Sequence, residues 1–135
     1  AEPDRPLVCI AGDGGFMFTM NELATAAQFH LPIVVLVMND GAYGNVRRTQ
    51  IEDYGNRTLC TDLVNPDMLK LAEAFGIDGA RVRTPEELRP VLRRALSRRV
   101  PCLIEARVGP FPSPWPILRP IGGGAALAKP PRPPA

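Results

Sequence analysis

Two short stretches near the start of the chain are apolar at every position. Leu7–Ala11 and Ile33–Met38 contain no polar residue. Such runs predict strands that are buried on both faces, as in a parallel sheet. Between them, Thr19 and Glu22 have the spacing of a capping box, which predicts a helix that ends before Pro32. The apolar face of this helix is expected to contain Met20, Leu23, Ala24 and Ala27. Strand, helix and strand in this order predict a βαβ unit with two parallel strands.

Two further helical patterns follow. The first is expected to begin with Asn65 as its cap and Pro66 in its first turn, and to end at Gly76. The second follows Thr84, which forms a capping-box pattern with Glu87. Both patterns carry an apolar stripe that is expected to face the sheet. The inward residues are Met68, Leu71, Ala72 and Phe75 in the former helix, and Leu88, Val91, Leu92 and Ala95 in the latter.

The remaining elements are shorter. A short helix is expected within residues 42–51, and strands are expected at residues 80–82 and 102–106. The fold class predicted for residues 1–108 is therefore α/β, with a parallel sheet and flanking helices. Residues 109–135 are rich in proline and glycine. They are expected to form an extended tail that is disordered after about residue 121.

Composition narrows the functional classes. The 135 residues are 45% hydrophobic and 22% charged, which is typical of one globular domain. A formal net charge of +2 is too small to indicate a nucleic-acid partner. No apolar run is long enough to span a bilayer, so no membrane segment is expected. The three cysteines lack the spacing of a zinc site or a disulfide framework, which favours a reducing cytoplasm. They are Cys9, Cys60 and Cys102.

Candidate chemistry lies directly after the two apolar strands. Gly12–Phe16 follows the first strand and Asn39–Gly41 follows the second. Ligands of open α/β sheets bind at the carboxyl ends of the strands, so Asp13 and Asp40 are expected to meet at one edge. The adjacent glycines leave backbone N–H groups open to an anion. Two carboxylates beside such groups indicate a divalent cation that holds a phosphate.

Several simpler interpretations of these motifs exist. A Gly-Asp-Gly sequence alone is more often a plain turn, but the second acidic loop favours a cofactor site. The glycines do not form a dinucleotide fingerprint, because Met17 occupies its third glycine position. His30 is the single histidine and is expected to have a surface or capping role at a helix end. With one histidine and only two serines, Ser97 and Ser113, a Ser-His-Asp hydrolase is not supported.

The two loops together resemble the diphosphate-binding domain of thiamine diphosphate enzymes. The resemblance rests on Gly12–Gly14 and Asn39–Asp40, with residues 15–38 between them. Glu22–Ala26 on the intervening helix and Gly41–Arg47 after the second loop add to it. The sequence is most similar to the acetolactate synthase and benzoylformate decarboxylase group.

The resemblance covers Leu7 to about Val108, and Pro112–Pro116 also resembles the tail of some acetolactate synthase-like members. It implies that Asp13, Asp40 and the backbone carbonyl of Ala42 bind Mg²⁺. Asp40 departs from the family pattern, which usually has a second asparagine there, and the additional charge changes the expected metal affinity. The cofactor-binding set implied by the resemblance is Gly12, Asp13, Gly14, Gly15, Phe16, Asp40, Ala42, Tyr43, Gly44 and Asn45. The residues expected to border the thiazolium ring or the substrate are Tyr43, Gly44, Asn45 and Val46.

The resemblance also implies an activity and its partners. The implied reaction is decarboxylation or carboligation of a 2-keto acid through the ylid of thiamine diphosphate. In the family, a glutamate on a separate pyrimidine-binding domain activates the cofactor, usually from a partner subunit of a homo-oligomer. No part of this sequence resembles that domain, so the chain is expected to be a fragment, truncated at its N-terminus and inactive alone.

Two alternatives remain open. The chain could be a non-enzymatic remnant or interaction module that keeps the α/β fold without a competent site. It could also be a metal-dependent phosphate-binding domain of a different α/β enzyme.

Overall fold

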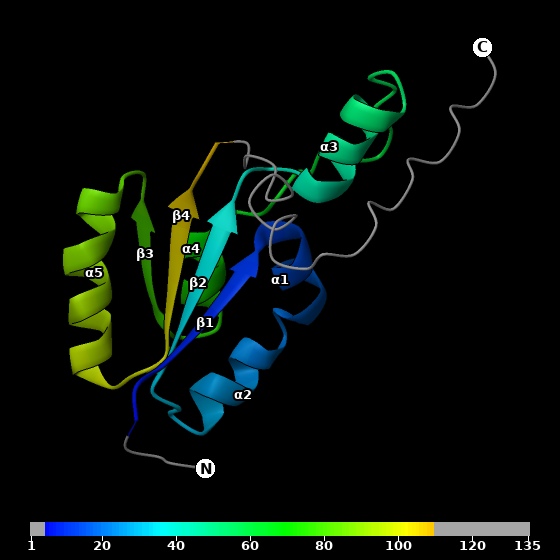
Figure 1. Cartoon of the computed structure of the whole chain (residues 1–135). Helices are drawn as coiled ribbons and strands as arrows, with labels where there is room; N and C mark the ends of the chain where they lie inside the picture. Colours follow the sequence, from blue (N-terminus) through cyan, green and yellow to red (C-terminus); the bar gives the residue numbers. More distant parts are fainter. Residues whose placement is uncertain (1–4, 110–135) are drawn as a thin grey trace, which may run out of the picture.

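Strands and helices alternate along most of the chain (Figure 1). The structure, a computed structural model, describes residues 5–109. The strands are β1 (Leu7–Gly12), β2 (Ile33–Asn39), β3 (Asp78–Val82) and β4 (Cys102–Arg107). The helices are α1 (Asp13–Thr19), α2 (Glu22–Gln28), α3 (Gly44–Asp53), α4 (Met68–Ala74) and α5 (Pro85–Arg98).

The four strands form one parallel sheet in the order β1-β2-β4-β3. In its register Val37 of β2 lies beside Glu105 of β4, and Arg81 of β3 lies on the other side of Glu105. The predicted α/β fold with a parallel sheet and flanking helices is confirmed. Because all strands run in one direction, the loops after β1 and β2 emerge at the same edge of the sheet.

Helices pack on both faces of the sheet, as the apolar stripes predict, except that Ala24 of the predicted inward face is exposed and Ala26 is buried instead. On one face, α1, α2 and α4 cover β2 and β4, and on the other face α5 covers them (Figure 1). Successive side chains along a strand point to opposite faces, so β2 contributes alternate residues to the two clusters. The first cluster contains Phe16, Leu23, Val35, Val37, Met68, Ala72, Ile77 and Leu103. The second contains Val34, Leu36, Val82, Ala95, Cys102, Ile104 and Ala106.

The prediction that the first strand is buried on both faces is wrong. β1 lies at an edge of the sheet, and Leu7 and Ile10 are 57% and 68% exposed. Ile10 pairs in register with Leu36, which lies on the α5 face of the sheet. The helix α5 packs mainly against β2, β3 and β4, and Ile10 on the edge strand is left largely exposed. An apolar sequence predicts a strand, but its neighbours decide how much of that strand is buried.

The start of the first helical region also differs from the prediction. Residues Gly12–Phe16 were expected to form a loop and Thr19 was expected to cap a helix, but α1 already begins at Asp13. Asn21 occupies the position before α2 and makes no side-chain cap hydrogen bond. Thr19 is the last residue of α1, so it lies at a helix end and does not precede the start of α2.

N-terminal caps were predicted for both α4 and α5. Asn65 was expected to cap α4, but the cap is Asp67, whose side chain accepts hydrogen bonds from the N–H groups of Leu69 and Lys70. Asn65 is used elsewhere, as described below. The predicted cap of α5 is confirmed, because the Thr84 hydroxyl accepts a hydrogen bond from the Glu87 N–H at 3.2 Å.

None of the helices described between residues 5 and 109 combines the length and the hydropathy of a membrane span. The predicted tail lies outside the described residues from residue 110 onward, and Pro112–Pro116 lies there with it.

Candidate functional site

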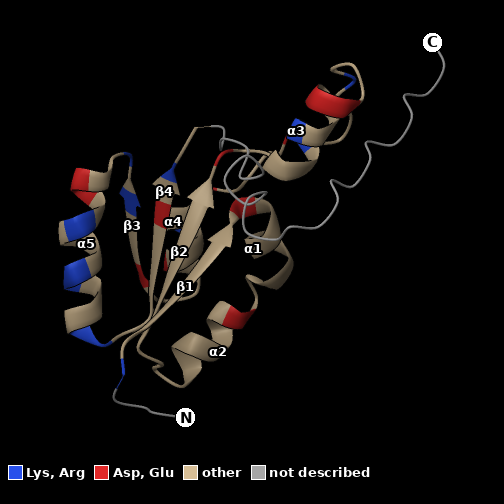
Figure 2. Ribbon diagram, in the orientation of Figure 1, with Lys and Arg blue, Asp and Glu red and all other residues tan. Residues whose placement is uncertain are grey.

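Asp13 and Asp40 lie at the same edge of the sheet. Asp13 is the first residue of α1, directly after β1, and Asp40 follows β2. Figure 2 shows acidic residues both at the start of α1 and in the loop after β2. Both side chains line one cavity of about 360 Å³. The residues around this cavity are Ile10, Ala11, Gly12, Asp13, Gly14, Gly15, Met38, Asp40, Ala42, Tyr43 and Gly44.

Asp13 is held firmly in place. Its side chain is buried, and its Oδ2 accepts hydrogen bonds from the Gly41 N–H at 3.0 Å and from Asn65 Nδ2 at 2.6 Å. Its position in the first turn of α1 is favourable for a negative charge, because the helix dipole is positive there. Two donors on one carboxylate oxygen fix the orientation of the whole group.

Asp40 lies close to Asp13, and its surroundings raise the pKa of its carboxyl group. Burial raises the pKa of Asp40, and the negative charge of Asp13 raises it further, while a hydrogen bond from the Ala42 N–H at 3.2 Å opposes this change. Two neighbouring carboxylates repel each other, so a bound cation would stabilise the pair. Mg²⁺ commonly takes one or two carboxylates together with backbone and phosphate oxygens.

The backbone of Ala42 is presented by a local bridge. Ala42 pairs with Asp62 in an isolated antiparallel bridge. The two hydrogen bonds of this bridge join the Leu63 N–H to the Gly41 carbonyl and the Tyr43 N–H to the Thr61 carbonyl, each at 2.8 Å. The Ala42 carbonyl takes no part in these two bonds, so the bridge holds Ala42 without using its oxygen.

At two glycines that line the cavity, a Cβ atom would clash with a neighbouring side chain. A Cβ on Gly14 would lie 2.6 Å from the ring of Tyr43. A Cβ on Gly44 would lie 2.5 Å from Asp40 Oδ2. Gly15 has no heavy atom within 4 Å of its Cβ position, so it leaves open space beside Asp13. The glycines therefore make room both for the Asp40 carboxylate and for a ligand, which fits a bound diphosphate.

Three of the predicted residues do not line the cavity. Phe16 is buried in the hydrophobic core under α1. Asn45 is exposed on α3, where its side-chain oxygen accepts a hydrogen bond from Arg48. Val46 is 51% exposed on the same helix. The structure therefore brings together both aspartates and the glycines, but not these three side chains.

Three polar residues connected to Asp13 by hydrogen bonds were not among the predicted site residues. Asn65 donates to both Asp13 Oδ2 and Asn39 Oδ1, at 2.6 and 3.2 Å. Asn39 in turn donates to the buried carboxylate of Glu105 at 2.7 Å. Glu105 could have been recognised in the sequence as a single acidic residue within the otherwise apolar run of β4. No local sequence pattern identifies Asn65 as a site residue.

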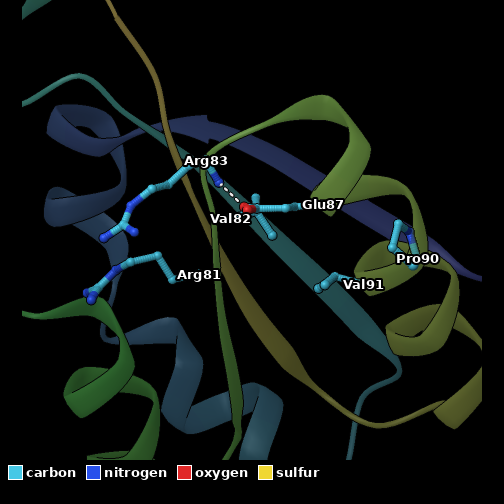
Figure 3. Close-up of a pocket in the computed structure, with 6 residues that line it drawn as sticks. All are labelled: Arg81, Val82, Arg83, Glu87, Pro90 and Val91. Carbon is cyan, nitrogen blue, oxygen red and sulfur yellow. Dashed lines mark hydrogen bonds between the residues drawn. The ribbon is translucent and has the colours of Figure 1, made fainter.

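A second cavity, of about 460 Å³, lies between the end of β3 and the start of α5 (Figure 3). Glu87 spans its rim by accepting a hydrogen bond from the Arg83 N–H at 2.7 Å. Arg81 extends away from Val91 and forms ion pairs with Asp67 at 3.1 Å and with Glu105 at 2.5 Å. The Arg81 and Glu87 side chains of this cavity are engaged in contacts within the fold, so the cavity lined by Asp13 and Asp40 is the better candidate site.

Among residues 5–109, no group of three or more histidine, cysteine, aspartate or glutamate side chains could hold a metal ion. Asp13 and Asp40 alone are an incomplete ligand set. A cation at this site would need backbone or phosphate oxygens as well, which is the mixed set that Mg²⁺ accepts.

Comparison with known proteins identifies the family of this chain. Residues 1–106 match the family described as "Thiamine pyrophosphate enzyme, C-terminal TPP binding domain". The chain is 41% identical over 107 residues to an acetolactate synthase of Bacillus subtilis, covering 79% of this chain and 19% of that protein. It is 36% identical over 127 residues to the mitochondrial acetolactate synthase catalytic subunit of Saccharomyces cerevisiae, covering 94% and 18%. The chain thus spans about a fifth of these relatives.

Solved structures show the same fold. A thiamine diphosphate-dependent 4-hydroxybenzoylformate decarboxylase of Rhodococcus jostii RHA1 is 32% identical, with a TM-score of 0.76, over 83% of this chain and 21% of that chain. Benzoylformate decarboxylase from Polynucleobacter necessarius is 23% identical, with a TM-score of 0.75, over 82% and 21%. With matches to both the family and its fold, the chain belongs to the thiamine pyrophosphate enzymes, as their C-terminal cofactor-binding domain.

Proposed function

We propose that this chain binds the diphosphate of thiamine diphosphate through a Mg²⁺ ion held by Asp13, Asp40 and the carbonyl oxygen of Ala42. The observation that carries the proposal is the shared cavity, in which the two carboxylates lie beside each other and beside open glycines. A divalent cation would remove the repulsion between the carboxylates and would attract the diphosphate to the same point.

Each residue would have a distinct task. Asp13 would offer the carboxylate oxygen that is not engaged by Gly41 and Asn65. Asp40 would offer Oδ2, because its Oδ1 accepts the Ala42 N–H. Gly14 and Gly15 would present backbone N–H groups to phosphate oxygens near the start of α1. Tyr43, held beside Gly14 by the bridge, would border the cofactor.

The complete enzyme is proposed to decarboxylate or ligate 2-keto acids. Bound thiamine diphosphate supplies the stabilised carbanion that such reactions need. The residues of this chain would bind and orient the cofactor, whereas a pyrimidine-binding domain of the complete homo-oligomeric enzyme would supply the activating glutamate. By itself this chain is proposed to be inactive, and a cytoplasmic location stays a prediction.

Titration calorimetry of the full 135-residue chain with thiamine diphosphate and Mg²⁺ tests the proposal. Asp13→Asn removes the charge but keeps an oxygen that accepts hydrogen bonds. We expect this substitution to weaken binding by at least about 100-fold. Loss of a residue that only hydrogen-bonds to a metal ligand already lowers metal affinity by about 10–100-fold, and Asp13 is proposed as a ligand itself. Asp78→Asn is the matched control, because it removes the same charge from the start of β3, at the opposite edge of the sheet.

The outcomes separate the three interpretations. Binding that needs Mg²⁺ and is lost only in Asp13→Asn supports the proposal. A folded chain that gives no heat with the cofactor favours a remnant or interaction module. Binding of a nucleoside diphosphate in place of thiamine diphosphate favours a different metal-dependent phosphate site.

A further inference from the structure

We propose that Glu105 is a positioning residue for the diphosphate site, because it fixes the orientation of Asn39 and thereby the donors that hold Asp13. The proposal rests on the proposed function for its link to cofactor binding. Glu105 lies on β4, outside the cavity around Asp13 and Asp40. It acts only through other side chains and touches no bound group itself.

The carboxylate of Glu105 is fully buried yet completely paired. Its Oε1 accepts hydrogen bonds from Asn39 Nδ2 at 2.7 Å and is paired with Arg107 Nε at 2.6 Å. Its Oε2 is paired with Arg81 Nε at 2.5 Å. A buried charge is tolerated only when such partners surround it, so each donor is held strongly in place.

A carboxylate can only accept hydrogen bonds, and this determines which way Asn39 points. Asn39 must turn its NH₂ group toward Glu105, so its carbonyl oxygen faces the opposite side. There Asn39 Oδ1 accepts hydrogen bonds from the Gly41 N–H at 3.1 Å and from Asn65 Nδ2 at 3.2 Å. The charge of Glu105 therefore sets the polarity of an amide that reaches the loop after β2.

The same two donors also hold Asp13. The Gly41 N–H and Asn65 Nδ2 both donate to Asp13 Oδ2, at 3.0 and 2.6 Å. An unbroken series of hydrogen bonds thus runs from Glu105 through Asn39 to Gly41 and Asn65, and then to Asp13. Partners of metal ligands fix ligand orientation in this way, and their loss typically costs 10–100-fold in affinity.

Glu105 also has a structural role that the experiment must separate. Its pairing with Arg81 joins β4 to β3, so any substitution is expected to lower stability. Glu105→Gln keeps the shape of the side chain but replaces one oxygen by an NH₂ group. That group must face either Arg81 or the pair Asn39 and Arg107, and all of these are donors.

The test uses the full 135-residue chain and two readouts. We expect Glu105→Gln to raise the Kd for thiamine diphosphate with Mg²⁺ by 10–100-fold in calorimetry. Independently of any ligand, hydrogen exchange of the Gly41 amide is expected to become about fivefold faster, as for the loss of one hydrogen bond. This second readout reports on the loop itself rather than on the cofactor.

Ile104→Val is the matched control for stability. Ile104 is fully buried next to Glu105 on β4, but it faces the α5 side of the sheet. It is expected to destabilise the fold without changing the Kd or the exchange of Gly41. Asn39→Ala is the second variant, since it breaks the series and leaves Glu105 paired with both Arg81 and Arg107. Combined with Glu105→Gln, it is expected to add little to the effect of either change alone.

Two results would overturn the inference. One is a folded Glu105→Gln chain whose Kd and Gly41 exchange match those of Ile104→Val. The other is an Asn39→Ala chain in which hydrogen exchange of the Gly41 amide is unchanged. This second result decides the question if Glu105→Gln does not fold. If the unmodified chain does not bind thiamine diphosphate, the proposed function fails, and the Gly41 exchange alone decides whether Glu105 positions the loop.

Discussion

Gly44→Ala provides a selective test of Asp40 as a ligand. Gly44 is the first residue of α3, and a Cβ there would lie 2.5 Å from Asp40 Oδ2. Outside the neighbouring backbone of α3, the three heavy atoms nearest to this Cβ all belong to the Asp40 side chain. The substitution therefore has one direct consequence, which is that the Asp40 carboxylate must move.

The size of this movement follows from the contact distances. Ordinary contact begins at 3.4 Å, so Oδ2 must move by about 0.9 Å or turn away. Mg²⁺ holds its ligands at about 2.0–2.1 Å in a nearly ideal octahedron. A displacement of this size is incompatible with an intact Mg–oxygen bond. We expect thiamine diphosphate with Mg²⁺ to bind at least about 10–100-fold more weakly.

The same substitution should not harm the fold. Alanine is preferred to glycine in a helix by up to about 1 kcal/mol, and the displaced group is the free end of a flexible side chain. The free energy of unfolding in urea is therefore expected to stay the same or to increase slightly. Calorimetry gives the Kd of the same sample. Thr49→Ala on the exposed side of α3 is the control, since it favours the helix without approaching Asp40.

A single result would refute this reasoning. If Gly44→Ala binds thiamine diphosphate and Mg²⁺ as tightly as the unmodified chain while Asp13→Asn does not, Asp40 is not a metal ligand. The site would then depend on Asp13 without its neighbour.

Two further predictions concern ionisable groups away from the cavity. The pKa of Asp67 is lowered by its hydrogen bond from Arg81 and by the N–H groups that it caps, so its ionised form stabilises the fold above the ordinary value of 3.8. Asp67→Asn should therefore lower the free energy of unfolding at pH 7. The difference in free energy of unfolding between the two chains should shrink as the pH falls below about 3.8. A difference that does not depend on pH in urea titrations would contradict this. Burial raises the pKa of Cys102, so iodoacetamide at pH 8 should modify the exposed Cys9 first and Cys102 only after unfolding. Peptide mass spectrometry measures the two modification rates. Equal rates for Cys9 and Cys102 in the folded chain would show that the Cys102 thiol is accessible.

Several features could be predicted because they depend on local sequence. The fully apolar stretches were sufficient to locate β1 and β2, and the stripe of α5 identified its inward residues. The predicted cap of Thr84 is confirmed because its partner Glu87 is only three residues away. Such features involve neighbours along the chain, whose geometry is set by backbone periodicity.

Other features depend on partners distant in sequence. Asn65 has the local pattern of a helix cap, yet its amide bonds to Asp13, which is 52 positions away. Glu105 interacts with Asn39, 66 positions away, through strand pairing in the middle of the sheet. No periodicity in the sequence reveals such contacts, because they form only when β2 and β4 lie side by side.

The sequence by itself determined the class of the fold and the edge at which Asp13 and Asp40 emerge, because two successive parallel strands end on the same side. Only the tertiary structure decided that β1 is an exposed edge strand and that α1 begins directly at Asp13. It also decided that Asn39, Asn65 and Glu105 connect the interior of the sheet to the cavity. The physical reason is that burial and hydrogen-bond partners depend on which elements pack together, whereas strand and helix periodicity depends on neighbouring residues.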